Sequence, residues 1–498
     1  MMNPTTASST APTSAPQPQR VYRGAANLRS IAYQVFSARM SRRDGSGLLT
    51  LLSIAAFTAV TAIVMIVASG TWMFVYREQH PRELAVHAIA ADPTMSTLLG
   101  FYVFLAGFAC ALLIFPVLSL TSSATLLGAR MRERRLACFR LLGLSRAEVN
   151  RMGLIDTLVQ AAVGVVLGTG GTLLLLPFFQ RLSFQGDTVR YEEILAPLWL
   201  YALLDIALLG FVTLSAWWSL VRINISPLGV SRRSAPRALR FWRIAVLIAA
   251  IGLFLLTPAP RLSSGPAQYA KSVAVIVVFL LSVDLVMPLV MQLASRLLAR
   301  APWLLVSWPA RRITLEPVKA WRRVSGVAAV SLIVAVLASA PFQNPSDPNI
   351  QDAVTQMFAE FDRDITTGVI FTISFTFILA GISAMMNQCS AEFERAPQTL
   401  ALHKMGVPNR VGLAVSWLEM LGPLVGTCVM TFIFGRILFL PYSSYQEFTD
   451  TDPTVFEHPA SWIAIVVAGA VVMVVALSVT LPVRSRVLAG AKRVRRAD

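Results

Sequence analysis

From residue 48 onward the sequence is a succession of apolar runs separated by short polar connections. Most of these runs are close to the roughly 20 residues that an α-helix needs to cross a bilayer. Because the hydrocarbon core cannot satisfy backbone N–H and C=O groups, runs of this length predict membrane-spanning helices. We therefore expect an all-α polytopic membrane protein with about ten transmembrane helices. They lie at 48–75, 98–120, 154–179, 198–220, 244–260, 272–293, 324–341, 365–386, 413–440 and 461–482, of which the fifth and seventh are the shortest.

The composition excludes other broad classes of protein. Hydrophobic residues make up 55% of the 498 residues and charged residues only 14%, whereas soluble globular chains carry about 25% charged residues. Four cysteines are too few for a disulfide scaffold. The net charge of +17 makes nucleic acid a candidate partner. However, the basic residues are spread over six separate connections, so we expect no nucleic-acid binding.

The basic residues predict the orientation of the chain in the membrane. With an even number of spans both termini lie on one side, and the connections on that side carry 35 of the 43 Lys and Arg residues, against seven on the other side. Positively charged connections stay in the cytoplasm, so both termini are predicted to be cytoplasmic. The preference for Arg over Lys is typical of a GC-rich bacterial genome. We expect a multi-pass protein of the bacterial cytoplasmic membrane.

An internal repeat relates the first and last parts of the chain. When Gly143 is aligned with Gly406, an offset of 263 residues also aligns Arg132 with Arg395 without a gap. Six spans separate the equivalent positions, so the two copies have the same orientation and their pseudo-two-fold axis runs along the membrane normal. Inverted-repeat transporters are built differently.

The third span of each copy carries two glycines four residues apart, a pattern that lets membrane helices approach closely. They are Gly164 and Gly168 in the first copy and Gly422 and Gly426 in the second. With the repeat, the chain divides into six predicted parts. These are a disordered tail (1–20), an amphipathic interfacial helix (21–47), the first four-helix repeat (48–220), a linker with spans 5 and 6 (221–303), the second repeat (304–482) and a basic cytoplasmic tail (483–498).

The repeated segment resembles the FtsX/MacB-type permeases of ATP-binding-cassette (ABC) transporters. The sequence MRERRLACFRLLGLSR followed by Asp156 is similar to the family motif, and ERAPQTLALHKMGVPNR followed by Glu419 matches it more loosely. Arg135 and Gln398 stand where the family often has Glu. The large extracellular domain of other members is also missing. The resemblance therefore implies a ten-helix, two-repeat form of this FtsX-like permease family without that domain.

The resemblance implies that segments 129–151 and 392–410 dock on a cytoplasmic ABC ATPase subunit, with two copies of that subunit per permease chain. The alternative interpretation is that their positive charges only hold the topology. No phosphate-binding G-x-x-x-x-G-K-[ST] sequence occurs in the chain. We therefore expect no enzyme activity or cofactor on this chain, with ATP and Mg on the partner. The expected coupling residues are Arg132, Arg134, Leu136, Phe139, Arg140, Leu142 and Gly143, together with Arg395, Leu400, His403, Lys404 and Gly406.

Five charged residues fall within the predicted spans, where ionisable groups are functional candidates by default. Asp156 and Glu419 are predicted in the first turns of spans 3 and 9, where the helix dipole favours a carboxylate. Asp205 is close enough to the outer end of span 4 to pair with Arg436. Asp284 is the deepest charge, and either a buried hydrogen bond or a role in transport would explain it. No catalytic or metal-binding set of residues is predicted.

These observations favour a permease subunit of an ATP-driven ABC transporter. We expect it to export or extract an amphipathic or lipophilic compound, such as an antimicrobial peptide, a drug or a lipid. One alternative is an ion-coupled secondary transporter that uses Asp205, Asp284 and Arg436 as a relay. The other is a scaffold that transports nothing and signals to a membrane sensor kinase.

Overall fold

The computed structural model describes residues 46–80, 93–141, 145–223, 242–257, 265–337, 353–406, 409–443, 463, 467–475 and 478. Within these ranges the side chains of some helix ends are not described, among them those of residues 126–141. The predicted tails (1–20 and 483–498) and all but two residues of the predicted interfacial helix (21–47) lie outside the described residues.

The described part of the chain is almost entirely helical, and the prediction of an all-α polytopic membrane protein is confirmed. Among the described residues, six helical stretches are long and apolar enough to cross a membrane. The shorter apolar stretches Trp242–Leu256 and Ala414–Met430 coincide with predicted spans 5 and 9. The total of ten spans stays a prediction, since span 10 is described only in part. The six are Thr50–Gln79, Leu99–Thr125, Asn150–Phe179, Tyr191–Trp218, Pro266–Leu298 and Arg363–Glu392.

The first repeat is built around the contact between its first and third helices. Helix α2 packs against α5 and α4, and α7 lies against α5. A Cβ atom on Gly164 would lie 2.5 Å from Phe57 Cβ, and one on Gly168 would lie 2.5 Å from Thr61 Cβ. Both glycines therefore permit the close approach of α5 to α2 that their spacing predicts. The helices are α2 (Ser46–Gln79), α4 (Pro93–Leu141), α5 (Arg146–Phe179) and α7 (Leu198–Ile223).

The second repeat has the same arrangement, with α11 (Pro317–Leu337) packed against α12 (Ala353–Lys404) and α13 (Asn409–Ser443). However, no atom of the described residues lies within 4 Å of a Cβ placed on Gly422 or Gly426. Among the described residues, these two glycines therefore do not make the close contact that Gly164 and Gly168 make; residues 444–462 and part of span 10 lie outside the described residues.

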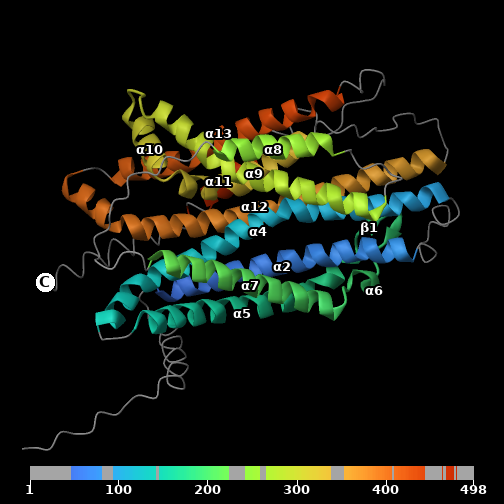
Figure 1. The fold of residues 1–498 in the computed structure, drawn as a ribbon, viewed down its shortest axis with the longest axis horizontal. Helices are drawn as coiled ribbons and strands as arrows, with labels where there is room; N and C mark the ends of the chain where they lie inside the picture. The colour runs from blue at the N-terminus through green and yellow to red at the C-terminus, as the bar shows by residue number, and fades with distance from the viewer. Residues whose placement is uncertain are drawn as a thin grey trace, which may run out of the picture.

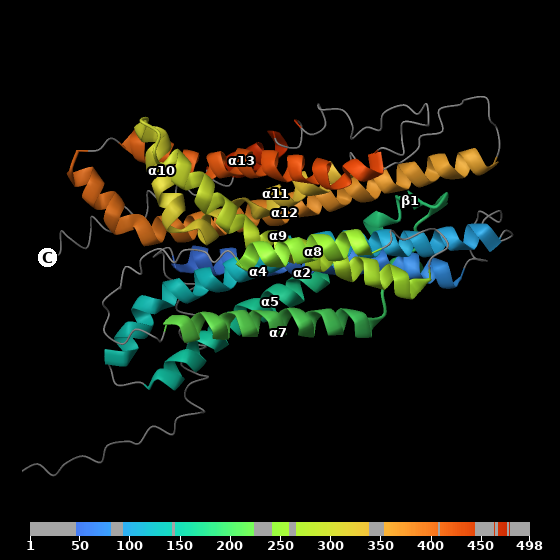
Figure 2. The same cartoon turned by 45° about the horizontal axis from the view of Figure 1, so that its top comes forward.

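The two repeats meet along α4 and α12, which run side by side in the same direction (Figures 1 and 2). Tyr102 Oη donates a hydrogen bond of 2.8 Å to Asp364 Oδ2 near one end of this pair. Further along, Asn387 Nδ2 donates one of 3.0 Å to Ser123 Oγ. The two contacts join residues 262 and 264 positions apart. This agrees with the offset of 263, because residues that meet at a two-fold axis parallel to the helices occupy equivalent positions.

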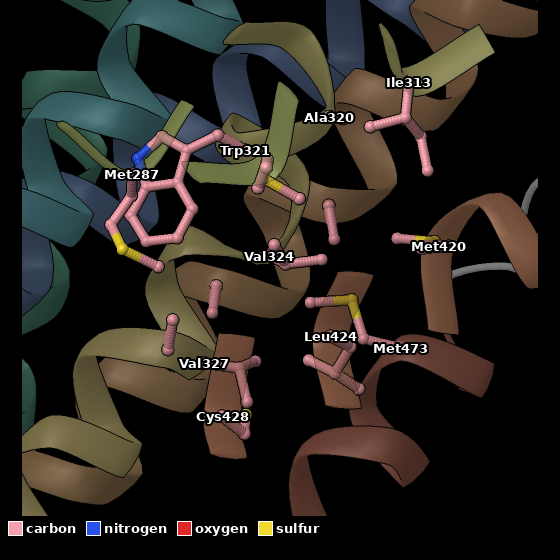
Figure 3. Packing of buried hydrophobic residues seen from close by; sticks show 14 residues of the cluster. Met287, Ile313, Ala320, Trp321, Val324, Val327, Met420, Leu424, Cys428 and Met473 are labelled. Carbon is pink, nitrogen blue, oxygen red and sulfur yellow. The ribbon is translucent and has the colours of Figure 1, made fainter. Parts of the chain in front are cut away.

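The linker helices α8 (Trp242–Leu256) and α9 (Pro266–Leu298) pack against each other, and α9 also contacts α4, α10 and α11. Helix α10 (Leu304–Leu315) precedes α11 and was not predicted as a separate element. A core cluster joins α9 to α13, and Figure 3 shows Trp321 next to Met287 on one side of it. Met420, Leu424 and Met473 lie on the other side.

A small hairpin between α5 and α7 departs from the helical pattern. Strands β1 (Ser183–Phe184) and β2 (Asp187–Thr188) are antiparallel. Gln185 and Gly186 between them have φ values of 58° and 73°, as a type I′ turn requires. Helix α6 (Tyr191–Ile194) follows. We call the end of the bundle with this hairpin the hairpin end, and the opposite end, where α4 and α12 finish, the coupling end (Figure 1).

Candidate coupling site

The predicted coupling segments are the ends of membrane helices. Helix α4 has 49 residues and α12 has 52, which at about 1.5 Å per residue makes each more than about 70 Å long. The hydrocarbon core is only about 30 Å thick. The candidate membrane spans found within them, Leu99–Thr125 and Arg363–Glu392, take up only part of each helix, and both helices continue without a break to the coupling end (Figure 1). Segments 129–151 and 392–410 are therefore not separate short connections between spans. Each consists of the end of one long helix and the start of the next.

The second coupling segment ends in a glycine turn. After α12 ends at Lys404, the Met405 backbone N–H donates a hydrogen bond of 3.1 Å to the carbonyl of Ala401. Gly406 then has a φ of +83°, a left-handed conformation that glycine adopts at little cost and that often terminates helices. The glycine of the repeated motif is thus explained, in this copy, as a helix stop that reverses the chain toward α13.

The first coupling segment restarts with a capping box. The Glu148 backbone N–H donates to Ser145 Oγ at 3.3 Å, and the Ser145 backbone N–H donates to Glu148 Oε2 at 2.9 Å. These bonds satisfy N–H groups at the start of α5. The hydrogen bonds from the Ser145 backbone and hydroxyl hold the pKa of the exposed Glu148 carboxyl below its usual value. The start of α5 is therefore fixed by local chemistry at the coupling end.

We expect Gly406→Ala to destabilise the turn by about 1–2 kcal/mol, because a left-handed backbone brings Cβ too close to the following carbonyl. No atom of the described residues lies within 4 Å of a Cβ placed on Gly406, so we attribute the loss to the change in backbone conformation and not to a collision. Gly422→Ala is the matched control, since Gly422 lies within α13, also has open space and needs no unusual φ. Thermal unfolding in detergent should show a lower Tm for Gly406→Ala alone; equal Tm values would contradict this explanation.

The structure leaves the docking role of the coupling residues as a prediction. Gly406 is described, whereas Leu142 and Gly143 lie outside the described residues. The other nine lie on the described backbone, with side chains that are not described. Of these, Arg132, Arg134, Leu136, Phe139 and Arg140 belong to the last turns of α4, and Arg395, Leu400, His403 and Lys404 to the end of α12.

Glu419 forms a buried ion-pair cluster near the coupling end. Its carboxylate lies 2.9 Å from Arg323 Nη1 of α11 and 3.5 Å from Arg312 Nη1 of α10. The side chains of Glu419 and Arg323 are 3% and 4% exposed. Helix α13 begins at Asn409, so Glu419 lies in the third turn, beyond the reach of the helix dipole. The first-turn prediction is corrected, and two arginines compensate the charge instead.

Asp156 holds the equivalent position in α5, which begins at Arg146, so it too lies beyond the first turn. The carboxylate accepts a hydrogen bond of 3.3 Å from Gln160 Nε2. The arginine pair before span 1, at residues 42–43, lies outside the described residues. The sequence identified both acidic residues as equivalent but not the partners of Glu419. An Arg-Arg pair precedes the first span of each repeat, at 42–43 and at 322–323, and this repeated pair was the sequence signal that could have identified Arg323 as a partner.

Two of the remaining intramembrane charges, Asp284 and Asp205, accept hydrogen bonds from side chains of other helices. Asp284 accepts a hydrogen bond from Trp321 Nε1, which lies in the second turn of α11. Asp205 accepts one of 3.0 Å from Thr169 Oγ1. The predicted pairing of Asp205 with Arg436 is not tested, because the side chain of Arg436 in α13 is not described. The contact of Asp284 joins the linker to the second repeat, and its role in transport stays a prediction.

Among the described residues, no group of three or more His, Cys, Asp or Glu side chains could hold a metal ion. Residues 107–225 match the family model described as FtsX-like permease C-terminal. Residues 107–225 of the chain are therefore similar to the FtsX-like permeases.

The match covers most of α4 with its coupling segment, all of α5, the hairpin and α7, which together make up the last three helices of the first repeat. No curated protein matches the chain. The resemblance to the FtsX-like permeases is therefore confirmed. Members of this family are the membrane subunits of ABC transporters, they generally have no enzymatic activity, and they generally work with an ABC ATPase partner.

Proposed function

We propose that this permease is the transmembrane subunit of an ATP-driven ABC transporter in a bacterial cytoplasmic membrane. A separate ATPase docks at the α4–α5 and α12–α13 turns, and the movement of its two nucleotide-binding halves separates or joins the coupling ends of α4 and α12. ATP and Mg are held by that partner. Two equivalent turns, one in each repeat, favour two copies of the ATPase per permease chain.

The observation that carries this proposal is the continuity of α4 and α12. Each helix runs unbroken from the hairpin end, through its apolar stretch, to the coupling turn. A force applied at the turn is therefore transmitted along the same helix into the membrane. Pro116 within α4 is a point at which that helix can bend. The ion pairs of Glu419 extend this connection from α13 to α10 and α11.

We propose an amphipathic or lipophilic compound as the cargo, taken up from the lipid and exported or extracted. The connections at the hairpin end are short. Leu174 and Leu198, near that end of α5 and α7, are 84% and 79% exposed, as residues facing lipid are. Capture from the bilayer through the sides of the bundle therefore suits this chain better than capture by an external domain.

Co-purification of an ATPase subunit tests the docking surface. We expect Leu136→Asp combined with Leu400→Asp to lower the amount of ATPase that co-purifies by more than about tenfold, since a charge in an apolar docking contact costs at least about 2 kcal/mol. Leu315→Asp is the matched control, because Leu315 is an exposed leucine at the end of α10, outside both coupling segments. Equal recovery from all three proteins would contradict docking at these segments.

Two further outcomes distinguish the alternative functions. Flux driven by a proton gradient alone, and lost in Asp284→Asn, would indicate an ion-coupled secondary transporter. ATPase binding without movement of any compound, together with co-purification of a sensor kinase, would indicate a signalling scaffold.

A further inference from the structure

At the hairpin end, a buried carboxylate of the second repeat holds the hairpin of the first. Asp364 of α12 accepts a hydrogen bond of 2.7 Å from the Gln185 backbone N–H and one of 2.8 Å from the Tyr102 hydroxyl. Asp364 is 7% exposed and Gln185 is 3% exposed. Residues 179 positions apart are thus joined by a hydrogen bond to a buried carboxylate, and hydrogen bonds to charged groups are stronger than those between neutral groups.

The hairpin is in turn fixed to α2 by a fully buried arginine. Arg77 Nη1 donates to the carbonyl of Phe184 at 2.7 Å, and Nη2 donates to that of Thr188 at 3.1 Å. Its Nε donates to Glu193 Oε2 at 2.9 Å. These bonds hold both strands and α6 against the end of α2. The hairpin is therefore a rigid extension of the first repeat, and the bond to Asp364 connects the two repeats.

Aromatic rings fill the space beside this bond. Phe361 of α12 packs against Phe101 and Tyr102 of α4, with ring centroids 5.9 and 5.3 Å apart. Phe74 of α2 packs against Tyr102 and Phe184, at 5.6 and 5.7 Å. Rings from both repeats and the hairpin thus lie in contact. The hairpin ends of α4 and α12 are closed in this structure by apolar packing as well as by the hydrogen bonds.

We propose that the hairpin Ser183–Thr188 and Asp364 form a clasp that keeps the outer side of the permease closed, and that the clasp releases when cargo leaves between the repeats. This inference rests on the proposed transport function. The two hydrogen bonds to the Asp364 carboxylate are short, so they are either formed or, once the groups separate, replaced by hydrogen bonds to water. The clasp therefore gives the outer end two discrete states, as gating requires.

Hydrogen exchange of the permease with its co-purified ATPase, in nanodiscs, tests the clasp. In the absence of ATP we expect Asp364→Ala to raise the exchange rate of residues 182–190 by about tenfold or more, since it removes a buried charge-assisted hydrogen bond. Tyr102→Phe should have a smaller effect, because the bond to Gln185 remains. Glu192→Gln is the control: it removes a negative charge from an exposed residue of α6 and should leave exchange unchanged.

Addition of ATP then tests the release. We expect faster exchange at 182–190 in the unmutated permease. Unchanged exchange there, while residues 400–406 respond to ATP, would overturn the gating role; unchanged exchange in Asp364→Ala without ATP would overturn the clasp itself. If ATP affects neither segment but Asp364→Ala still loosens the hairpin, the clasp is supported as a contact between repeats and the ATP-driven function is contradicted.

Discussion

Glu419→Ala is expected to destabilise the permease by about 3–5 kcal/mol, because Arg323 would keep its buried charge without a partner. The side chain of Arg323 is 4% exposed and donates to Glu419 at 2.9 Å. Chemical denaturation in detergent, followed by tryptophan fluorescence, measures the loss. Trp321 lies two residues from Arg323 and belongs to the core cluster that contains Met420, the neighbour of Glu419, so it reports on this region.

An exposed ion pair in the same part of the chain provides the control. Lys319 Nζ lies 2.7 Å from Glu316 Oε1, with side chains 37% and 44% exposed. Glu316→Ala should therefore cost less than about 1 kcal/mol. Replacing both Glu419 and Arg323 with leucine removes both charges and should recover much of the stability lost by Glu419→Ala. A loss below about 1 kcal/mol for Glu419→Ala would show that the pair contributes little to the fold.

The second large effect is expected for Arg77→Met at the hairpin end. The change leaves the Glu193 carboxylate, 4% exposed, without its closest positive charge, and leaves two hairpin carbonyls without their donors. We expect a loss of about 3–5 kcal/mol, measured by the same denaturation experiment. Proteolysis between residues 180 and 190 should also become faster, because the hairpin loses its attachment to α2.

Arg190 provides a matched control for Arg77, because it contacts the same glutamate from the surface. Arg190 Nε lies 3.8 Å from Glu193 Oε1, and its side chain is 48% exposed. Arg190→Met should cost less than about 1 kcal/mol. Arg77→Lys should restore only part of the stability, since a single ammonium group cannot reach the carboxylate and both carbonyls with the geometry of the guanidinium. Equal losses for Arg77→Met and Arg190→Met would contradict the assignment of Arg77 as the group that holds the hairpin.

These residues show where reading the sequence fails. Arg77 lies just after the first predicted span and Arg323 just before the seventh, so both were counted only as basic residues of the connections. Helix α10 was missed because its 12 residues, with Pro309 inside them, are too few for a span and lie in a basic connection. The continuity of α4 and α12 was missed because a hydropathy pattern marks only the part of a helix that lies in lipid. The helix itself continues until its backbone is terminated, as α12 is before Gly406.

The sequence by itself determined the class of protein, most of the spans and the parallel repeat. Each of these depends on local composition or on self-similarity: a membrane helix satisfies its own backbone within one segment, and the offset of 263 residues appears in the alignment of Gly143 with Gly406. Only the tertiary structure decided the partners of the buried charges, the hairpin and its bond to Asp364. Such contacts depend on how helices far apart in the chain are rotated and placed against one another, and no local pattern encodes that geometry.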